Sequence, residues 1–258
     1  MDNIVGRHFS SKNFGDFIVK GKADDNLFTV EFVKTKYTTN TSLNKIKNGT
    51  VRDRLVPTLY GVGFLGDEIT SDSSGKMLKE YQLWKNMLER CYCEKYHARK
   101  PTYKDCSVSD FFKNYSNFKK WCNQQVGFNV KGYSLDKDIL VKGNKIYSES
   151  TCAFVPKDIN NLLTKRESRR GDLPIGVVRC RTSSNYASKC VANGKNVHLG
   201  HYKNIECAFL AYKNFKEKHI KDLAKKLQHA VDARVLSSLL KYEVSISDWT
   251  IQCRGDRH

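Results

Sequence analysis

Residues 1–66 alternate apolar and polar positions in short runs, a pattern that predicts a small β-rich unit. Along 27–33 the alternation gives two faces: Leu27, Thr29, Glu31 and Val33 against Phe28, Val30 and Phe32. A turn over 22–26 joins this run to the preceding strand at 17–21. The small polar residues of 67–76 then end the alternation, which indicates a linker.

From residue 77 the apolar spacing becomes helical, first through Leu78, Tyr81, Leu88 and Cys91. Residues 90–106 read as a loop. A second helix is expected to begin at Ser109, a suitable N-cap, and to carry Phe111, Tyr115, Phe118 and Cys122 on one stripe. We interpret these aromatic side chains as core packing, so they build a scaffold and not a site.

The stretch "YSLDKDILVKGNKIYSESTCAFVPKDINNLL", residues 133–163, changes period three times. Residues 133–140 read as a strand, 141–145 as a turn around Gly143, and 146–155 as a second strand. A helix follows, with Pro156 well placed in its first turn. The pattern predicts a ββα unit.

Residues 174–223 predict three strands and a covering helix. Asn193-Gly194 lies between two alternating runs and is a strong hairpin signal, because both central positions of a type I′ turn need positive φ. The helical face is formed by Ile205, Ala208, Phe209, Tyr212, Phe215, Ile220 and Leu223. In the tail, a short helix is expected over 233–242, then alternation over 244–253 that fits one more strand or a docking segment.

Taken together, these patterns predict an α+β protein with three domains and a tail. They are a small β-rich domain at 1–66, a helical plus ββα domain at 77–165, a three-stranded antiparallel sheet with a packed helix at 172–228, and a tail at 229–258.

The composition indicates the kind of partner that the protein binds. The chain holds 45 Lys and Arg against 27 Asp and Glu, a formal charge of +18. Such an excess favours nucleic acid, through release of counterions from phosphates, although an anionic membrane surface would attract it too. Residues 165–226 alone carry 15 basic and 5 acidic residues. No apolar run approaches the ~20 residues that span a bilayer, and the first residues lack a signal-peptide core, so a cytosolic protein is expected.

Nine cysteines are scattered along the chain without the spacing of a disulfide scaffold. We interpret them mainly as small buried apolar residues. The alternative is a zinc site built from Cys91, Cys93, His97 and Cys106, although the paired Cys-x-x-Cys spacing of structural zinc sites is missing.

Residues 133–163 resemble the HNH nuclease family, in particular phage-encoded members with "LDKDI" in place of the usual Asp-His. The resemblance implies a DNA endonuclease that uses Mg²⁺ or Mn²⁺. It implies Asp136, Asp138 and Asn160 as metal ligands, and it puts Lys137 at the position of the family's histidine and Thr151 at that of its strand asparagine. A hard cation with oxygen ligands and several waters neutralises charge on a scissile phosphate.

Lys137 and Thr151 depart from the family's histidine and asparagine, and three explanations of how the unit works remain open. Lysine is a poor base at neutral pH, because its unperturbed pKa is about 10.4. In the first explanation Lys137 contacts the scissile phosphate and helps Asp136 and Asn160 in catalysis without a side-chain base. In the second, His97 or another histidine supplies the base. In the third, the unit binds DNA but does not cleave it.

Residues 174–223 resemble the APETALA/ethylene-response-factor DNA-binding domain, on "PIGVV", "YASKCVANGK", "VHLGHY" and "ECAFLAY". The resemblance implies that a three-stranded sheet enters the major groove of double-stranded DNA. The residues expected to contact DNA are Arg169, Arg170, Arg179, Arg181, Lys189, Lys195 and His198. The lysines of the covering helix, Lys213, Lys216, Lys221 and Lys225, read as a solvated face.

The N-terminal domain, through its closing segment "GTVRDRLVPTLYGVGFLG", resembles the first unit of the same phage proteins. Two roles are open for it: to extend the contact with DNA through Lys45, Lys47, Arg52 and Arg54, or to bind a protein partner. The expected protein is therefore a phage-encoded, HNH-type endonuclease of the homing or nicking kind, acting in the cytoplasm of the infected bacterial host. Its rivals are an inactive DNA-binding regulator or inhibitor of host functions, and an RNA-binding module. The sequence leaves the oligomeric state open.

Overall fold

The structure is a computed structural model that describes residues 4–163, 173–181 and 183–244. These residues form two compact units: one comprises the chain up to 122 together with 145–149, and the other comprises 123–144 and the chain from 150 onward. Helices and several small sheets make up both, so the α+β class predicted from the sequence is confirmed. The predicted domain boundaries stay predictions.

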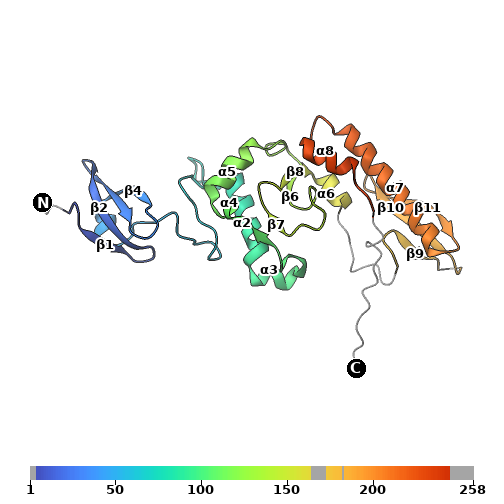
Figure 1. Cartoon of the computed structure of the whole chain (residues 1–258), viewed down its shortest axis with the longest axis horizontal. Helices are drawn as coiled ribbons and strands as arrows, with labels where there is room; N and C mark the ends of the chain where they lie inside the picture. Colours follow the sequence, from blue (N-terminus) through green and yellow to red (C-terminus); the bar gives the residue numbers. More distant parts are fainter. Residues whose placement is uncertain (1–3, 164–172, 182, 245–258) are drawn as a thin grey trace, which may run out of the picture. The chain divides into compact units, whose positions relative to one another are not determined.

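The first unit begins with an antiparallel meander in the order β1-β2-β3-β4 (Figure 1). Its strands are β1 (His8–Ser11), β2 (Gly15–Asp24), β3 (Leu27–Phe32) and β4 (Thr38–Ser42), followed by α1 (Leu43–Lys47). Val30 and Phe32 are buried and Phe28 packs against their core, as the alternation predicts. The turn between β2 and β3 is tighter than expected, because β2 runs on to Asp24.

Arg54 organises the loop that leaves this sheet. Its Nε donates to the carbonyl of Gly66 at 2.5 Å, and its Nη2 donates to the carbonyl of Glu68. The guanidinium is therefore engaged by the protein's own backbone, and Arg54 holds the loop closed.

An aromatic core joins the helices of the first unit. They are α2 (Lys79–Tyr92), α3 (Glu94–Arg99), the 3₁₀ turn η1 (Pro101–Tyr103), α4 (Asp110–Lys113) and α5 (Tyr115–Gln124). Trp84, Phe112, Tyr115 and Phe118 are fully buried, and the indole N–H of Trp84 donates to the carbonyl of Phe112 at 2.7 Å. The aromatic residues of this region are scaffold, as expected.

Two sequence predictions for this region were wrong. Residues 90–106 contain α3 and η1 in place of a plain loop. The helix capped by Ser109 breaks at Asn114, which shifts the phase of the buried stripe. Phe112 is therefore buried, whereas Phe111 is 43% exposed.

The expected second strand of the ββα unit is also divided. Ile146–Tyr147 (β7) pairs in parallel with Ser107–Val108 (β5), whereas Ala153–Pro156 (β8) pairs antiparallel with Tyr133–Asp136 (β6). The polar turn between them explains the division, since the carboxylate of Glu149 there accepts from the hydroxyl of Ser109. Pro156 ends β8, and α6 (Lys157–Leu163) begins one residue later than predicted.

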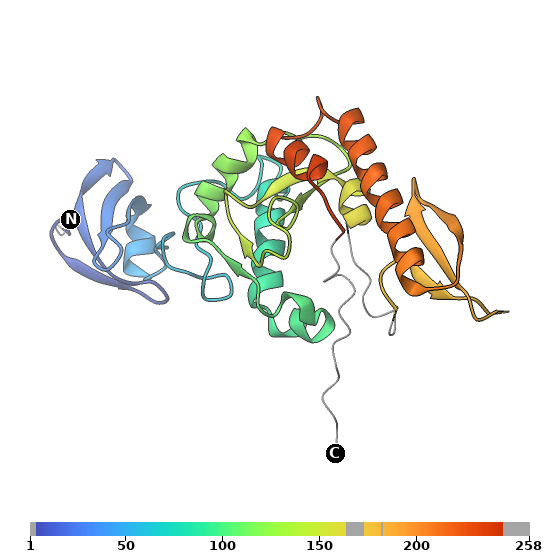
Figure 2. The same cartoon turned by 45° about the vertical axis from the view of Figure 1, so that its right-hand side comes forward.

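The second unit also holds the three-stranded sheet in the order β11-β10-β9, with α7 along one face (Figures 1 and 2). Its elements are β9 (Val177–Arg179), β10 (Tyr186–Ala192), β11 (Lys195–Tyr202) and α7 (Ile205–Lys226). Asn193 and Gly194 both have positive φ, which confirms the predicted hairpin turn.

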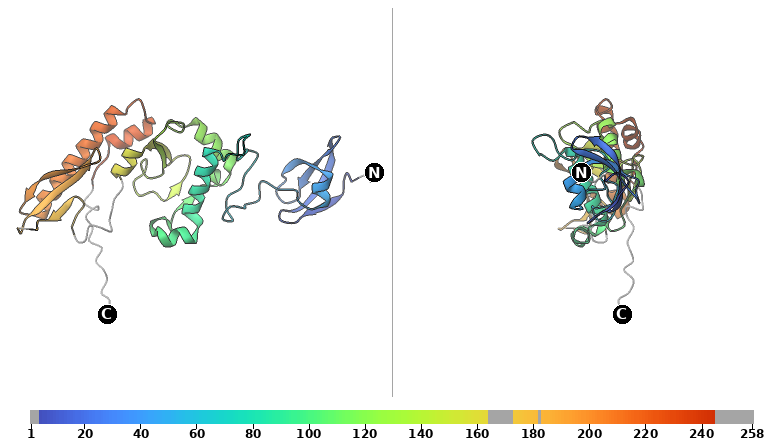
Figure 3. Two further views of the ribbon diagram at one scale, coloured as in Figure 1. Left: turned by 180° about the vertical axis from the view of Figure 1, so that it is seen from behind. Right: turned by 90° about the vertical axis from the view of Figure 1, so that its left-hand side faces the viewer.

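Helix α7 serves two cores. Its first half packs on the sheet through Ala208, Phe209 and Tyr212. Its second half joins α8 (Ala233–Leu240) and the ββα unit in a core that contains Ala153, Val155, Ile159, Ile220, Ala224, Val231, Val235 and Leu239. The left view of Figure 3 shows α7 along the sheet from behind. Residues 245–253, where a further strand or docking segment was predicted, lie outside the described residues.

Lys216 corrects the interpretation of the α7 lysines as a solvated face. It is 6% exposed, its ammonium donates to the carbonyl of Leu162 at 2.6 Å, and burial lowers its pKa. Lys216 therefore ties α7 to the end of α6.

Gly176 tests the packing of α7 on the sheet. Its φ is +83°, and a Cβ there would lie 2.0 Å from the ring of the buried Tyr212. Gly176→Ala is expected to destabilise by about 2–4 kcal/mol, from overpacking together with a strained backbone. Gly194→Ala is the matched control, because its φ is +74° but nothing lies within 4 Å of the added carbon. Urea unfolding measures both, and equal losses would show that the ring contact is unimportant.

Candidate active site

Ser134 and Asp136 share one face of the β6–β8 ribbon. In the antiparallel register Ser134 lies opposite Val155 and Asp136 lies opposite Ala153. Side chains that are directly opposite point to the same face of a sheet. Val155 and Ala153 pack with Ile159 of α6, so the hydroxyl and the carboxylate lie on the face that α6 covers.

Two backbone amides hold the Asp136 carboxylate. Its Oδ1 accepts from the N–H groups of Asp138 and Ile139, both at 2.7 Å. Within the described ranges Oδ2 accepts no hydrogen bond. Burial raises the pKa of Asp136 in spite of the two amides, which favour the ionised form. The strand end thus presents an oriented, partly desolvated carboxylate with one oxygen available for a ligand.

Asn160 reaches the same face from α6. Its Nδ2 donates to the hydroxyl of Ser134 at 3.3 Å. Because Ser134 and Asp136 are two residues apart on β6, this contact places the amide of Asn160 on the side of the strand that carries the carboxylate. The two residues that the sequence pattern singles out as metal ligands therefore do not point to opposite sides.

Lys137 lies in a different environment from the predicted contact with a scissile phosphate. It is 8% exposed, and its ammonium is paired with the carboxylate of Asp138 and donates to the carbonyl of Asn144 at 2.7 Å. The amide of Asn144 donates back to the carbonyl of Lys137 at 2.8 Å. In this structure Lys137 closes the loop over 137–144. The carboxylate of Asp138 pairs with the ammonium of Lys137, and the contact of Asp138 with Asp136 is made by its backbone N–H.

The remaining residues of the expected site lie elsewhere. Thr151 is in the turn before β8 and not in a strand. His97 belongs to the first unit, where its Nε2 lies 2.9 Å from the carbonyl of Arg90. Cys91 and Cys106 are buried, and no group of three or more His, Cys, Asp or Glu within the described residues is placed to hold a metal ion.

A hard divalent cation nevertheless fits the Asp136 site. One carboxylate and one amide are a sufficient protein contribution for Mg²⁺, which keeps several of its waters. The ammonium of Lys137 pairs with Asp138, and in the described part of the chain no ammonium or guanidinium is bonded to Asp136. A half-buried carboxylate that accepts no bond from a cationic side chain is a suitable ligand, because ion binding would offset its cost of desolvation.

Asp136→Asn is expected to stabilise the metal-free protein. Asparagine retains Oδ1 as the acceptor for the two amides but carries no charge. Because burial raises the folded pKa of Asp136 above its unfolded value, the carboxyl stabilises fully only below the unfolded pKa of about 3.9 and loses this contribution as pH rises through the folded pKa. The Tm should therefore rise near pH 7, and the gain should vanish near pH 3. A lower Tm at pH 7 would contradict this account.

The face of the three-stranded sheet opposite α7 is a candidate nucleic-acid surface. Lys189 of β10 lies directly opposite His198 of β11, and both are exposed. Cys190, the next residue of β10, is buried beneath α7 with Val177, so Lys189 and His198 point to the outer side. The sequence prediction placed both on the DNA surface, and they lie together.

Strand alternation separates Arg179 and Lys195 from this outer face. Arg179 is two residues from the buried Val177 and lies over the ring of Tyr186 at 5.5 Å, so it points to the α7 side. Lys195 lies opposite the buried Ala192 and also points to that side. Arg181 follows the end of β9 and is exposed. Arg169 and Arg170 lie outside the described residues.

The sequence analysis missed His201 and Cys180. A β-bulge changes the register between Ser188 and Lys189, so that Gly200 pairs with Ser188 but His198 pairs with Lys189. The extra residue on β11 brings His198 and His201, which are three apart, to the same face. Simple alternation places them on opposite faces, and only Gly200 was a signal, because glycine in a strand often marks a bulge.

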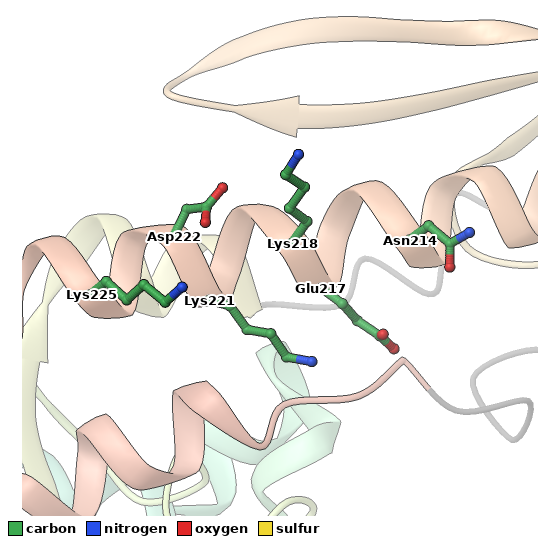
Figure 4. A pocket seen from close by; sticks show the side chains of 6 residues that line it. All are labelled: Asn214, Glu217, Lys218, Lys221, Asp222 and Lys225. Atoms are coloured by element: carbon green, nitrogen blue, oxygen red, sulfur yellow. The ribbon is translucent and has the colours of Figure 1, made fainter.

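The exposed flank of α7 forms a shallow hollow lined by Asn214, Glu217, Lys218, Lys221, Asp222 and Lys225 (Figure 4). Lys218 points toward the strands, whereas Glu217 and Lys221 point away from them. Glu217 is engaged by the ammonium of Lys213 at 2.6 Å and by the N–H of Val244 at 2.8 Å. Three lysines and two carboxylates line the hollow, and Lys218 and Lys221 point in opposite directions, so we interpret it as a solvated helix surface.

No protein-family model matches the chain, and comparisons with curated proteins and with solved structures give no match either. Within the described residues, no helix is both long enough and apolar enough to cross a bilayer.

Proposed function

We propose that this protein is a metal-dependent DNA endonuclease whose reaction centre is formed by Asp136 and Asn160. The observation that carries the proposal is the hydrogen bond from Asn160 to Ser134, which puts the helical amide on the strand face of a half-buried carboxylate oriented by two backbone amides. A carboxylate on a strand and an amide on the following helix, both on one face of a ββα unit, are the arrangement that the HNH resemblance implies.

Each residue has a definite task in this proposal. Asp136 offers Oδ2 as a ligand while two backbone amides fix Oδ1. The side-chain amide of Asn160, whose Nδ2 donates to Ser134, is the second protein group beside the ion. A bound Mg²⁺ or Mn²⁺ would supply charge neutralisation at the scissile phosphate and lower the pKa of its water. Lys137 and Asp138 brace the adjoining loop and take no direct part.

Binding of DNA is assigned to the outer face of the three-stranded sheet, through Lys189 and His198. A two-stranded ribbon fits the major groove of B-DNA, and exposed cations contribute by releasing counterions. The net charge of +18 supports a polyanionic partner. The resemblance further points to a phage protein of the homing or nicking kind, acting on double-stranded DNA in the cytoplasm of a bacterial host.

One observation favours a second candidate, a DNA-binding protein that does not cleave. Residues 133–163 contain no histidine, and the ammonium of Lys137 is engaged in its own loop. That segment therefore offers no imidazole as the general base that the HNH resemblance implies.

Plasmid cleavage separates the two candidates. Supercoiled DNA is incubated with the protein and Mg²⁺ or Mn²⁺, with and without excess chelator. The endonuclease is expected to produce nicked or linear plasmid only when the metal is free. Intact plasmid together with a retained gel shift supports the non-cleaving protein, and tighter binding of structured RNA than of duplex DNA at matched salt overturns both.

Lys189→Ala tests the assigned surface. Loss of one phosphate contact should weaken binding of all duplex sequences similarly and reduce the slope of log K against log salt by about 1. Lys225→Ala is the matched control, because it also removes one exposed lysine, but from the solvent-facing side of α7. Fluorescence anisotropy at several salt concentrations measures both slopes. Equal effects would mean that net charge, and not the sheet surface, determines binding.

A further inference from the structure

Cys180, His198 and His201 form a cluster of soft ligands on the outer face of the three-stranded sheet, away from the Asp136 site. The thiol sulfur of Cys180 lies 3.1 Å from Nδ1 of His201. The ring centres of His198 and His201 are 4.6 Å apart. All three side chains are at least partly exposed.

The fold brings the three residues together from distant positions. The bulge in β11 turns both histidines to the outer face. Cys180 follows β9, and its N–H donates to the carbonyl of Asn185 just before β10. Strand alternation puts Cys180 on the side of Val178 and opposite to Val177, which is buried against α7. Ala187 of β10 lies opposite Val178 on one side and His201 on the other. It faces outward but is only 3% exposed.

The distances are close to those of a tetrahedral zinc site. Zn–S bonds of about 2.3 Å and Zn–N bonds of about 2.0–2.1 Å at tetrahedral angles separate a sulfur from a nitrogen ligand by roughly 3.5 Å, and the centres of two bound imidazole rings by roughly 5 Å. The separations here are 3.1 Å and 4.6 Å. The three residues are not placed as a complete ligand set, so binding requires their side chains to rotate toward one ion.

We propose that Cys180, His198 and His201 bind a soft divalent transition metal, represented by Zn²⁺, with water completing the coordination. A thiolate with two imidazoles is a typical donor set for Zn²⁺ and a poor one for Mg²⁺, so this site is chemically distinct from the one at Asp136. Binding displaces the thiol proton to solvent. The main group that opposes metal binding is the positively charged ammonium of Lys189, which lies directly opposite His198 in the sheet.

The test uses the full-length, reduced and chelator-treated protein. Titration with Co²⁺ is followed through thiolate-to-metal charge-transfer absorption in the near ultraviolet, and Zn²⁺ is then added in competition. The wild type is expected to develop the band and to lose it when Zn²⁺ displaces Co²⁺. Cys180→Ser should remove the band, and His201→Asn should weaken binding at least about 100-fold, since even loss of an outer-shell partner costs about 10–100-fold. Lys189→Ala should tighten binding.

Two further cysteine variants locate the site. Cys207→Ser removes an exposed thiol from the start of α7 and should leave the titration unchanged. Cys93→Ser tests the alternative cluster near Cys91 and should also have no effect. Absence of the band in the wild type, or its persistence in Cys180→Ser, overturns the proposal. Circular dichroism of each variant identifies a loss that is due to unfolding, and none of these outcomes depends on DNA cleavage.

Discussion

Asp136→Ala is expected to reduce metal-dependent nicking of plasmid DNA by at least about 10³-fold. A metal ion contributes several kcal/mol to stabilising the charge of the transition state, and each 1.4 kcal/mol changes the rate tenfold. Alanine removes the only carboxylate on the α6-covered face of β6, so the ion would lose its charged ligand. Initial rates of loss of supercoiled plasmid, at saturating Mg²⁺ or Mn²⁺, measure the effect.

Asp158→Ala is the matched control for this experiment. Asp158 is an exposed carboxylate in the first turn of α6, two residues before Asn160. Its removal changes the net charge of the motif as Asp136→Ala does, but it should change the rate by less than about threefold, as surface substitutions are near neutral. Asn160→Ala should show an intermediate loss. Cleavage by Asp136→Ala at the wild-type rate would place the activity elsewhere in the chain.

Leu239→Ala is expected to destabilise the second unit by about 2–5 kcal/mol, the usual result of emptying a buried leucine site. Leu239 is 2% exposed and packs in the core that holds Val155 and Ile159. These residues belong to β8 and α6, which position the candidate site. The variant should therefore also lose cleavage activity at temperatures that the wild type tolerates.

The adjacent residue provides the control. Leu240 is 39% exposed, and Leu240→Ala should change stability by no more than about 0.5 kcal/mol. Urea unfolding followed by circular dichroism compares the two variants with the wild type. Similar small losses in both would mean that α8 is an appendage, and that the ββα unit is stable without it.

Local patterns accounted for much of the fold. The alternation at 27–33 identified the buried face of β3, because a strand repeats every two residues. Ser109 was recognised as an N-cap, and its hydroxyl accepts from the N–H of Phe112. Asn193-Gly194 was recognised as a hairpin turn because the two central residues of such a turn need positive φ, and both have it. Each of these features depends on neighbours within a few residues.

The candidate site was only partly accessible to the same reasoning. Asp136 and Asn160 were singled out by their positions in a ββα pattern, and the structure brings both to one face. Lys137 was assigned to the phosphate, but the fold gives its ammonium two partners in the loop. The choice of partner for a long side chain depends on how the loop closes, and loop closure is not a periodic property.

The sequence by itself thus determined the α+β class and most of the main strands and helices, and it singled out Asp136 and Asn160. Only the tertiary structure decided that 146–155 contains two strands, β7 paired with β5 and β8 paired with β6. It also decided that α8 completes the core under the site, and that a bulge brings His198 and His201 to one face beside Cys180. The physical reason is one of range. Period and capping are set within one or two turns of chain, whereas register, strand partners and shared cores depend on residues far apart in sequence.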